Sequence, residues 1–303
     1  MFNGGSAMKI GFDLPHVGIH AHRPDGIALF AREVERLGAD SLWVGDRLFA
    51  AVDPQVNYPG VDGIPTEFRS SLDPFAVLSI AAAATTRPLL GTSVLIAPWY
   101  APPLLARSLA SIDQFSGGRL IAGLGIGWAP EEYSAVGVSM SERGARLDES
   151  LDSLEAYWTT NPVEHKGRFS STPPSWVDVK PAHRIPVYLP AFSSAGIARA
   201  ARRADGILPA TAPGFFDPAM ITGLLGQVRA GAEQAGRNPA DIDVILRVNT
   251  KAGESVESIV DVLVRARDEA GVEHAFVDLT FRDRADSVEH AIELAGQILE
   301  QAR

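Results

Sequence analysis

The sequence alternates, over nearly its whole length, between short apolar runs and longer stretches with helical periodicity. Eight apolar runs predict strands, at residues 8–14, 41–45, 89–96, 120–124, 186–190, 206–209, 242–248 and 275–281. Eight stretches with apolar residues every three or four positions predict helices, at residues 25–37, 73–86, 102–116, 139–158, 194–204, 217–236, 255–270 and 286–303. The runs are continuously apolar, as parallel strands covered on both faces are. This order predicts an α/β fold, a (β/α)8 TIM barrel.

The chain length agrees with this architecture. A chain of 303 residues can form one large barrel or two ordinary domains. Neither a linker, a low-complexity tract nor a charge run divides it, so we expect one domain over residues 8–303. Residues 1–7 precede a second possible start at Met8 and are predicted to be a disordered leader.

Composition narrows the class of partner. The formal charge of -10 opposes binding to phosphate backbones, so nucleic acid is not an expected partner. The longest apolar runs fall short of the roughly 20 residues that a membrane span needs, so no membrane is expected either. The absence of cysteine excludes disulfides and thiolate nucleophiles, and the N-terminus lacks the layout of a signal peptide. We therefore expect a cytoplasmic protein whose partner is a small molecule.

Barrel enzymes place their chemistry at the carboxyl ends of the strands. This rule selects His16 after the first predicted strand, Asp46 and Arg47 after the second, and Ser93 and Val94 at the third. It also selects residues 125–128, 191–196 and 209–211 and Asn249, in positions after later strands. The long connection at residues 48–72 is rich in Pro, Gly and Asp and predicts a lid or binding loop.

Three glycines, Gly123, Gly125 and Gly127, remove side chains from the end of the fourth predicted strand. A flat ligand could lie against such a backbone, but a glycine-rich strand end without a ligand is an equally good interpretation. Position 128 is Trp and no GK[ST] sequence follows, so dinucleotide and P-loop sites are poor interpretations.

Four separated motifs resemble those of luciferase-like monooxygenases in sequence and in order. They are SLWVGD at residues 41–46, LGTSVL at 90–95, SGGR at 116–119 with GLGIGW at 123–128, and RGARLDE at 143–149. The chain is most similar to the subgroup that uses the deazaflavin coenzyme F420. The resemblance implies a bacterial luciferase-like barrel, a flavin or deazaflavin across its mouth, hydride transfer at C5 of the cofactor, and a homodimer.

The resemblance also implies roles for residues near the predicted strand ends. A non-prolyl cis peptide would fall at Ser93-Val94, where the backbone would support the cofactor ring. The alternative is a strand end with an ordinary trans peptide. Asp46 would bond the polar edge of the cofactor or handle a proton, or else cap local amides. Many F420-dependent relatives have histidine where this chain has Arg47, which could pin a carboxylate substrate or stabilise a reduced ring.

Two further departures concern the fourth strand end. Sugar-phosphate dehydrogenases of the family have a catalytic glutamate where this chain has Trp128, so that substrate class is not expected. Trp128 would stack on substrate or cofactor, or pack beneath a loop. Bacterial luciferases have a phosphate-binding arginine where this chain has Ile126, within the cofactor-binding stretch Gly125, Ile126, Gly127 and Trp128.

Without that arginine, backbone amides at a helix start become the expected phosphate site. The helix that begins near Ser194 offers Ser193, Ser194 and Ala195, preceded by Phe192. Relatives have paired glycines where this chain has Phe192-Ser193, so the contacts there are expected to differ.

A metal-dependent hydrolase is a rival interpretation, because His20 and His22 form an H-x-H after the first strand. Such a site needs further histidines after the fifth and sixth strands, and none stands there, so we expect no metal. His16 remains a candidate for proton transfer or a structural histidine.

The expected function is hydride transfer between F420 and a small organic substrate. The alternatives are an FMN-dependent monooxygenase that uses oxygen, and a noncatalytic flavin-binding barrel.

Overall fold

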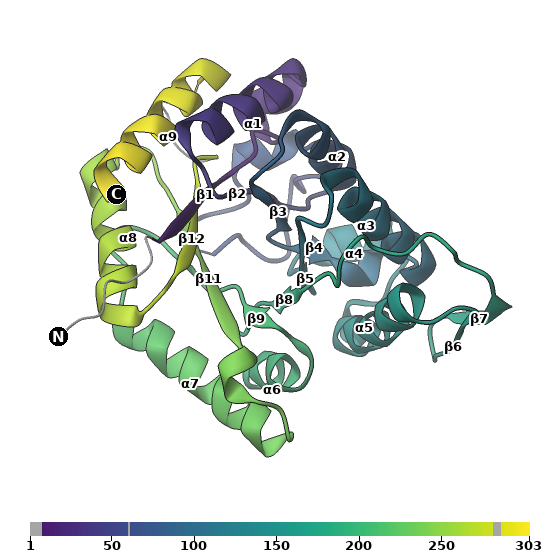
Figure 1. The fold of residues 1–303 in the computed structure, drawn as a ribbon. Coiled ribbons are helices and arrows are strands. Elements are labelled where there is room, and N and C mark those ends of the chain that lie inside the picture. Colours follow the sequence, from purple (N-terminus) through teal and green to yellow (C-terminus); the bar gives the residue numbers. More distant parts are fainter. Residues whose placement is uncertain (1–7, 60, 281–285) are drawn as a thin grey trace.

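The computed structural model describes residues 8–59, 61–280 and 286–303 and shows a closed parallel barrel with helices outside it (Figure 1). Neighbouring strands follow chain order, and the barrel closes where β9 pairs with β11 and β12 pairs with β1. The barrel strands are β1 (Lys9–Asp13), β2 (Ser41–Val44), β3 (Leu89–Thr92), β4 (Leu95–Ile96), β5 (Leu120–Gly125), β8 (Val187–Leu189), β9 (Gly206–Ile207), β10 (Ala210–Thr211), β11 (Asp243–Asn249) and β12 (His274–Asp278). The predicted (β/α)8 barrel is confirmed.

A helix follows each position of the barrel. The helices are α1 (Asp25–Leu37), α2 (Pro74–Ala84), α3 (Pro102–Ser116), α5 (Arg143–Thr159), α6 (Ser194–Arg203), α7 (Pro218–Gln234), α8 (Val256–Ala270) and α9 (Val288–Ala302), with a short α4 (Pro130–Ala135) before α5. Capping side chains mark the beginnings of several helices. Asp73, Asp217 and Ser255 each accept a hydrogen bond from a backbone amide in the first turn of the helix that follows. Among the described residues, none of these helices is long and apolar enough to cross a membrane.

Two predicted strands are interrupted. The run at residues 89–96 divides into β3 and β4 at Ser93. Of the run at residues 206–209 only Gly206–Ile207 forms a strand, β9, and the short β10 follows beyond the predicted run. The predicted leader and Phe281, the expected last residue of the eighth strand, lie outside the described residues.

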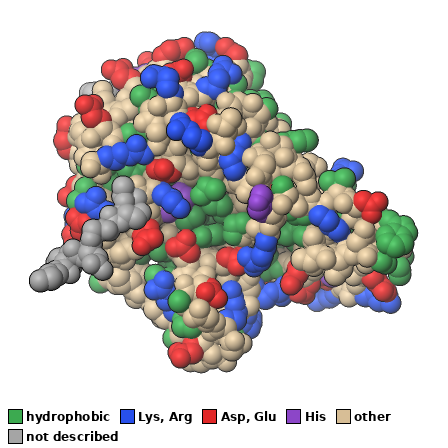
Figure 2. Space-filling view, in the orientation of Figure 1, with side chains coloured by type: hydrophobic (Ala, Val, Ile, Leu, Met, Phe, Trp, Pro, Cys, Tyr) green, Lys and Arg blue, Asp and Glu red, His purple; other side chains and the backbone are tan. Residues whose placement is uncertain are grey.

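A hairpin projects from the barrel between α5 and β8 (Figure 1). It consists of β6 (Val163–Lys166) and β7 (Ser171–Ser175), paired antiparallel, and lies outside the eight apolar runs that predict strands. Pro173 and Pro174 obscured the strand, but a strand in a two-stranded ribbon has a free edge and tolerates proline. Trp176, just beyond β7, is 76% exposed, and Figure 2 shows hydrophobic side chains at this end of the molecule.

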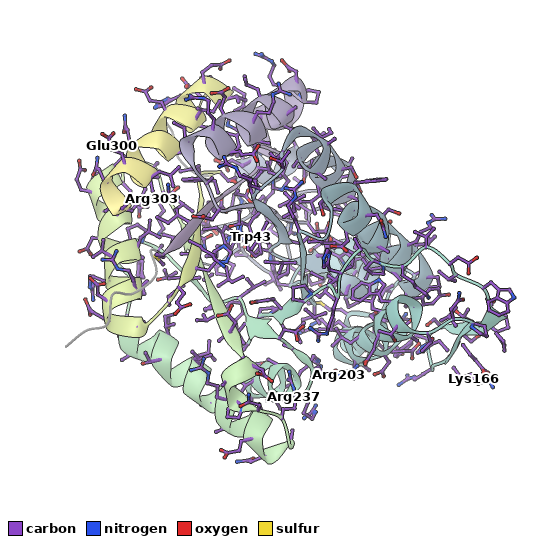
Figure 3. All side chains as sticks on the ribbon, viewed as in Figure 1. Trp43, Lys166, Arg203, Arg237, Glu300 and Arg303 are labelled. Atoms are coloured by element: carbon purple, nitrogen blue, oxygen red, sulfur yellow. The ribbon has the colours of Figure 1, made fainter. Side chains whose placement is uncertain are left out.

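The barrel interior is filled by side chains beneath the strand ends. Trp43 lies within the barrel (Figure 3) and stacks on Phe276 with ring centroids 4.4 Å apart. Tyr188 and Leu208 complete this cluster with Ile121 and Ile245. A Cβ at Gly91 would lie 2.3 Å from the Trp43 ring, so glycine there makes room for the indole. These side chains fill the barrel interior, as they do in other barrels of this kind.

Candidate active site

A cavity of about 600 Å³ lies at the carboxyl ends of the strands. The predicted site residues that line it are His16, Asp46, Arg47, Ser93, Val94, Ile126, Gly127, Trp128, Phe192, Ala210 and Asn249. The long connection after β2 contributes Tyr58, Pro59 and Phe68 to the wall. Residues selected by the strand-end rule and residues of the long connection therefore line the same cavity, and ligand binding there stays a prediction.

One wall of the cavity is the backbone between β3 and β4. The Ser93-Val94 peptide is cis, at the position that the resemblance implied. Gly125 does not line the cavity, but a Cβ there would lie 2.5 Å from the Val94 Cγ2. Its role in the structure is to leave room for Val94, which reaches the cavity wall.

Asp46 is a buried carboxyl beside that wall. Its Oδ2 accepts hydrogen bonds from the Ile96 amide at 3.0 Å and the Tyr100 hydroxyl at 2.9 Å. Burial raises the pKa of Asp46 to about 6, although both hydrogen bonds oppose the shift. A carboxyl with such a pKa can give or take a proton near neutral pH.

Arg47 lies between two aromatic rings at the cavity edge. Its guanidinium carbon is 4.6 Å from the Trp128 ring centroid and 5.1 Å from that of Phe68. The side chain is 10% exposed and pairs with Glu132, which also accepts the Leu48 amide at 2.8 Å. The carboxylate bound by Arg47 in the structure is thus the chain's own, and Trp128 packs on this arginine.

His16 is buried with both ring nitrogens in use. Nδ1 lies 2.7 Å from the Leu14 carbonyl oxygen, and Nε2 accepts the Gly45 amide at 3.2 Å. These partners select the neutral tautomer protonated on Nδ1, and burial lowers the pKa of His16. Proton transfer by His16 stays a prediction, and it requires that one of these contacts opens.

A buried charge cluster, which sequence reasoning did not select, lies at the same end of the barrel. Arg247 on β11 pairs with Asp278 on β12, and Thr280 donates to Asp13 on β1 at 3.3 Å. All four residues line the cavity. The signal was present, because each charged residue interrupts an otherwise apolar run near its carboxyl end.

The two carboxyl groups of this cluster, Asp13 and Asp278, differ in pKa. Burial and the neighbouring Asp278 raise the pKa of Asp13 well above its ordinary value. Burial alone would also raise the pKa of Asp278, but Arg247 and Thr280 outweigh burial and lower it. Asp278 is therefore ionised beside Arg247, whereas Asp13 tends to hold its proton.

Buried polar atoms without partners mark where a ligand would bind. Among the described residues these include Nε of Arg47, Nε of Arg247 and Oδ1 of Asn249, and all three side chains line the cavity. A buried unpaired donor or acceptor is costly, so these atoms suit the polar edge of a bound molecule.

The predicted phosphate site lies at the start of α6, beside the cavity rather than in its wall. Phe192 lines the cavity and is 71% exposed. Ser193 accepts the Gly196 amide at 3.2 Å and caps the helix, and Ser194 and Ala195 are exposed in its first turn. Anion binding there stays a prediction.

The H-x-H residues lie in the 3-10 helix Gly18–His22, where His22 Nε2 is 3.0 Å from the Ser70 hydroxyl. Over the part of the chain that the structure describes, no group of three His, Cys, Asp or Glu residues could hold a metal ion.

Comparisons with known proteins agree with the fold. A family model described as luciferase-like monooxygenase matches residues 8–302. An F420-dependent glucose-6-phosphate dehydrogenase of Kribbella flavida is 29% identical over 244 residues, which cover 78% of this chain and 68% of that protein.

Two solved structures share the fold. Monooxygenase RslO1 from Streptomyces bottropensis has a TM-score of 0.79 at 20% identity, covering 97% of this chain and 98% of its own. An F420-dependent secondary alcohol dehydrogenase, in complex with an F420-acetone adduct, has a TM-score of 0.75 at 17% identity, covering 98% and 100%. Since the family model spans the barrel from β1 through α9, the chain is an enzyme that belongs to the luciferase-like monooxygenase family.

Proposed function

We propose that this enzyme binds coenzyme F420 in the cavity and transfers a hydride between it and a small organic substrate. The observation that carries the proposal is a buried acid, Asp46, bonded directly to the backbone wall that contains Ser93 and Val94. The F420-dependent relative and the F420-dependent alcohol dehydrogenase of the same fold support the choice of cofactor.

The cavity fits a planar ring with a polar edge. Val94 supplies an apolar surface, and the unpartnered atoms of Arg47, Arg247 and Asn249 supply donors and an acceptor. F420, when bound, supplies the hydride at C5 of its deazaflavin ring. The surrounding aromatic residues, Tyr58 among them, exclude water from such a ring.

Asp46 is the group that we assign to proton handling. Its carboxyl lines the cavity, and its Oδ1 makes no further hydrogen bond among the described residues. Substrate oxidation releases a proton that ionised Asp46 can accept, and reduction consumes one that protonated Asp46 can donate.

The substrate is proposed to be other than a sugar phosphate. Trp128 occupies the position of the glutamate in the sugar-phosphate dehydrogenases, and here it packs against Arg47. Arg47 in turn is neutralised by Glu132. The cytoplasmic location and the homodimer stay predictions, and light scattering of the purified protein measures the second.

An FMN-dependent monooxygenase is the second candidate, because RslO1, a monooxygenase, has the same fold. Titration of the purified protein with F420 and with FMN, followed by tryptophan fluorescence, separates the two. We expect F420 to quench Trp128, and Trp128→Phe to reduce the quenching. The matched control is Trp176→Phe, since Trp176 is exposed and does not line the cavity.

Tight FMN binding without an F420 response would overturn the proposal. Oxygen consumption with reduced FMN would then identify the monooxygenase.

A further inference from the structure

We infer that Arg247 is a positioning residue of this active site, which holds the Ser93 carbonyl and thereby the cavity wall formed by Ser93 and Val94. The inference rests on the proposed function for the identity of the ligand that this wall supports. The contacts of Arg247 do not depend on that function.

Arg247 joins two distant parts of the barrel. Its Nη1 donates to the Ser93 carbonyl oxygen at 2.8 Å, and its Nη2 donates to the Asp278 carboxylate. The guanidinium is planar, so binding two partners with two of its nitrogens fixes their relative positions. Arg247 therefore ties the segment between β3 and β4 to β12 across the mouth of the barrel.

The wall segment is held from three sides. The Ser93 amide donates to the Val44 carbonyl at 2.8 Å, which anchors it to β2. The Ser93 carbonyl is anchored by Arg247, and the Ile96 amide by Asp46 at 3.0 Å. Of these three anchors, two are side chains, Asp46 and Arg247, and both side chains also line the cavity.

The surroundings of Arg247 hold its orientation. Asp278 accepts the Thr280 amide at 2.9 Å, so its carboxylate is fixed before it meets the guanidinium. The Thr280 hydroxyl in turn donates to the Asp13 carboxyl group. Removal of the guanidinium would leave two buried carboxyl groups together with no cation from this cluster, so the site requires a positive charge there.

The Nε of Arg247, a side chain that lines the cavity, is a buried donor without a partner among the described residues. An acceptor atom of the bound molecule, such as a ring carbonyl, is the chemistry that would satisfy it. Arg247 would then orient the wall and the ligand through the same side chain.

The test compares Arg247→Lys with Arg237→Lys. Lysine keeps the charge but cannot reproduce the two-pronged contact. Arg237 is a matched control, because it also donates to backbone carbonyls, those of Ala201 at 2.9 Å and Ala204 at 2.7 Å, on the outside of the barrel (Figure 3).

Two measurements apply to both variants. Hydrogen exchange in the ligand-free protein is expected to quicken about tenfold at residues 93–96 in Arg247→Lys and to stay unchanged there in Arg237→Lys. The dissociation constant of F420 is expected to rise about tenfold or more in Arg247→Lys alone, as loss of one charged hydrogen bond predicts.

A folded Arg247→Lys variant with wild-type exchange at residues 93–96 would overturn the inference. If that variant does not fold, Asp278→Asn serves instead, since it retains Arg247 but removes its ionic partner. Unchanged exchange in the Asn variant would equally overturn it. Exchange needs no cofactor, so wild-type protein that binds neither F420 nor FMN would refute the proposed function while the exchange result still decides the role of Arg247.

Discussion

At the scale of single residues, Asp46 is a carboxyl in the cavity wall that ionises near neutral pH. Its pKa of about 6 results from burial, and the Tyr100 hydroxyl holds it from rising further. Glu132 and Asp73 are the nearby carboxylates that also raise it. The charge state of Asp46 therefore changes within the pH range in which we expect the enzyme to work.

We predict that Asp46→Asn lowers turnover by about 10²-fold or more, because asparagine cannot accept or give the proton. In the direction of substrate oxidation, wild-type turnover should rise with pH to a plateau above about pH 6, where Asp46 is ionised. This rise of turnover with pH should be absent from Asp46→Asn. Steady-state rates between pH 5 and 8 measure the loss of turnover and the loss of the pH dependence, and Tyr100→Phe is measured in the same way for comparison.

Tyr100→Phe removes a hydrogen bond that favours ionised Asp46, so its step should move to higher pH. A wild-type step that persists in Asp46→Asn would show that another group handles the proton.

The same ionisation predicts the sign of a stability effect. The folded pKa of Asp46 lies above its unfolded value near 3.8, so the folded state binds the extra proton. Its contribution to stability is complete below the unfolded pKa and is lost as pH rises towards about 6, by on the order of 2 to 3 kcal/mol. Asp46→Asn should therefore gain stability relative to wild type between pH 4 and 7, measured by urea unfolding.

At the scale of elements, the junction of β3, β4 and β5 shapes the cavity wall. Thr92 makes two hydrogen bonds to the Gly123 backbone through its hydroxyl, at 2.7 and 2.9 Å. A Cβ at Gly123 would lie 1.8 Å from the Thr92 carbonyl oxygen. The glycines of β5 are thus required by close approach of a neighbouring strand.

Gly125→Ala tests this element. The new methyl group would meet Val94 Cγ2 at 2.5 Å, so Val94 must move into the cavity. We expect a stability cost of about 1 to 3 kcal/mol and a weaker affinity for F420, measured by urea unfolding and fluorescence titration.

Gly226→Ala is the matched control, because Gly226 lies in α7 and a Cβ added there would meet no neighbouring atom within 4 Å. Alanine there should stabilise the helix by about 0.5 to 1 kcal/mol and leave F420 binding unchanged. Equal effects of the two substitutions would contradict a specific role for Gly125.

At the scale of the whole molecule, the first and last elements of the barrel lie side by side. β1 pairs with β12, and α9 packs beside α1 (Figure 1). Arg303 donates to the Gly38 carbonyl oxygen at 2.5 Å and to Asp40 at 3.2 Å, so the last residue contacts the end of α1. The barrel cannot close until its final elements are in place.

Removal of residues 288–303 should therefore abolish cooperative unfolding, because it deletes the buried side chains of Leu294, Ile298 and Leu299 and exposes the apolar surface that they cover. Circular dichroism during thermal unfolding measures this. Arg303→Ala removes only partly exposed contacts and should change the unfolding free energy by no more than about 1 kcal/mol. A truncated protein that unfolds as sharply as the full chain would show that the barrel does not depend on α9.

Local patterns determined the fold class and much of the cavity wall. Continuous apolar runs predict strands covered on both faces, and the strand-end rule then selected Asp46, Arg47 and Val94. Helix starts such as Asp73 were predictable because capping involves only neighbouring residues. The family resemblance located the Ser93-Val94 peptide, which no periodicity would have identified.

Contacts between distant residues were decided by the tertiary structure. Arg247 and Ser93 are 154 positions apart, and Thr280 and Asp13 are 267 apart. The sequence by itself determined which runs become strands and which charges interrupt them. Only closure of the barrel placed β11, β12 and β1 side by side, so that Arg247, Asp278 and Asp13 became a buried cluster and Glu132 became the partner of Arg47. The physical reason is that periodicity reports which face of an element is buried, whereas the pairing of buried charges depends on the elements that arrive beside it.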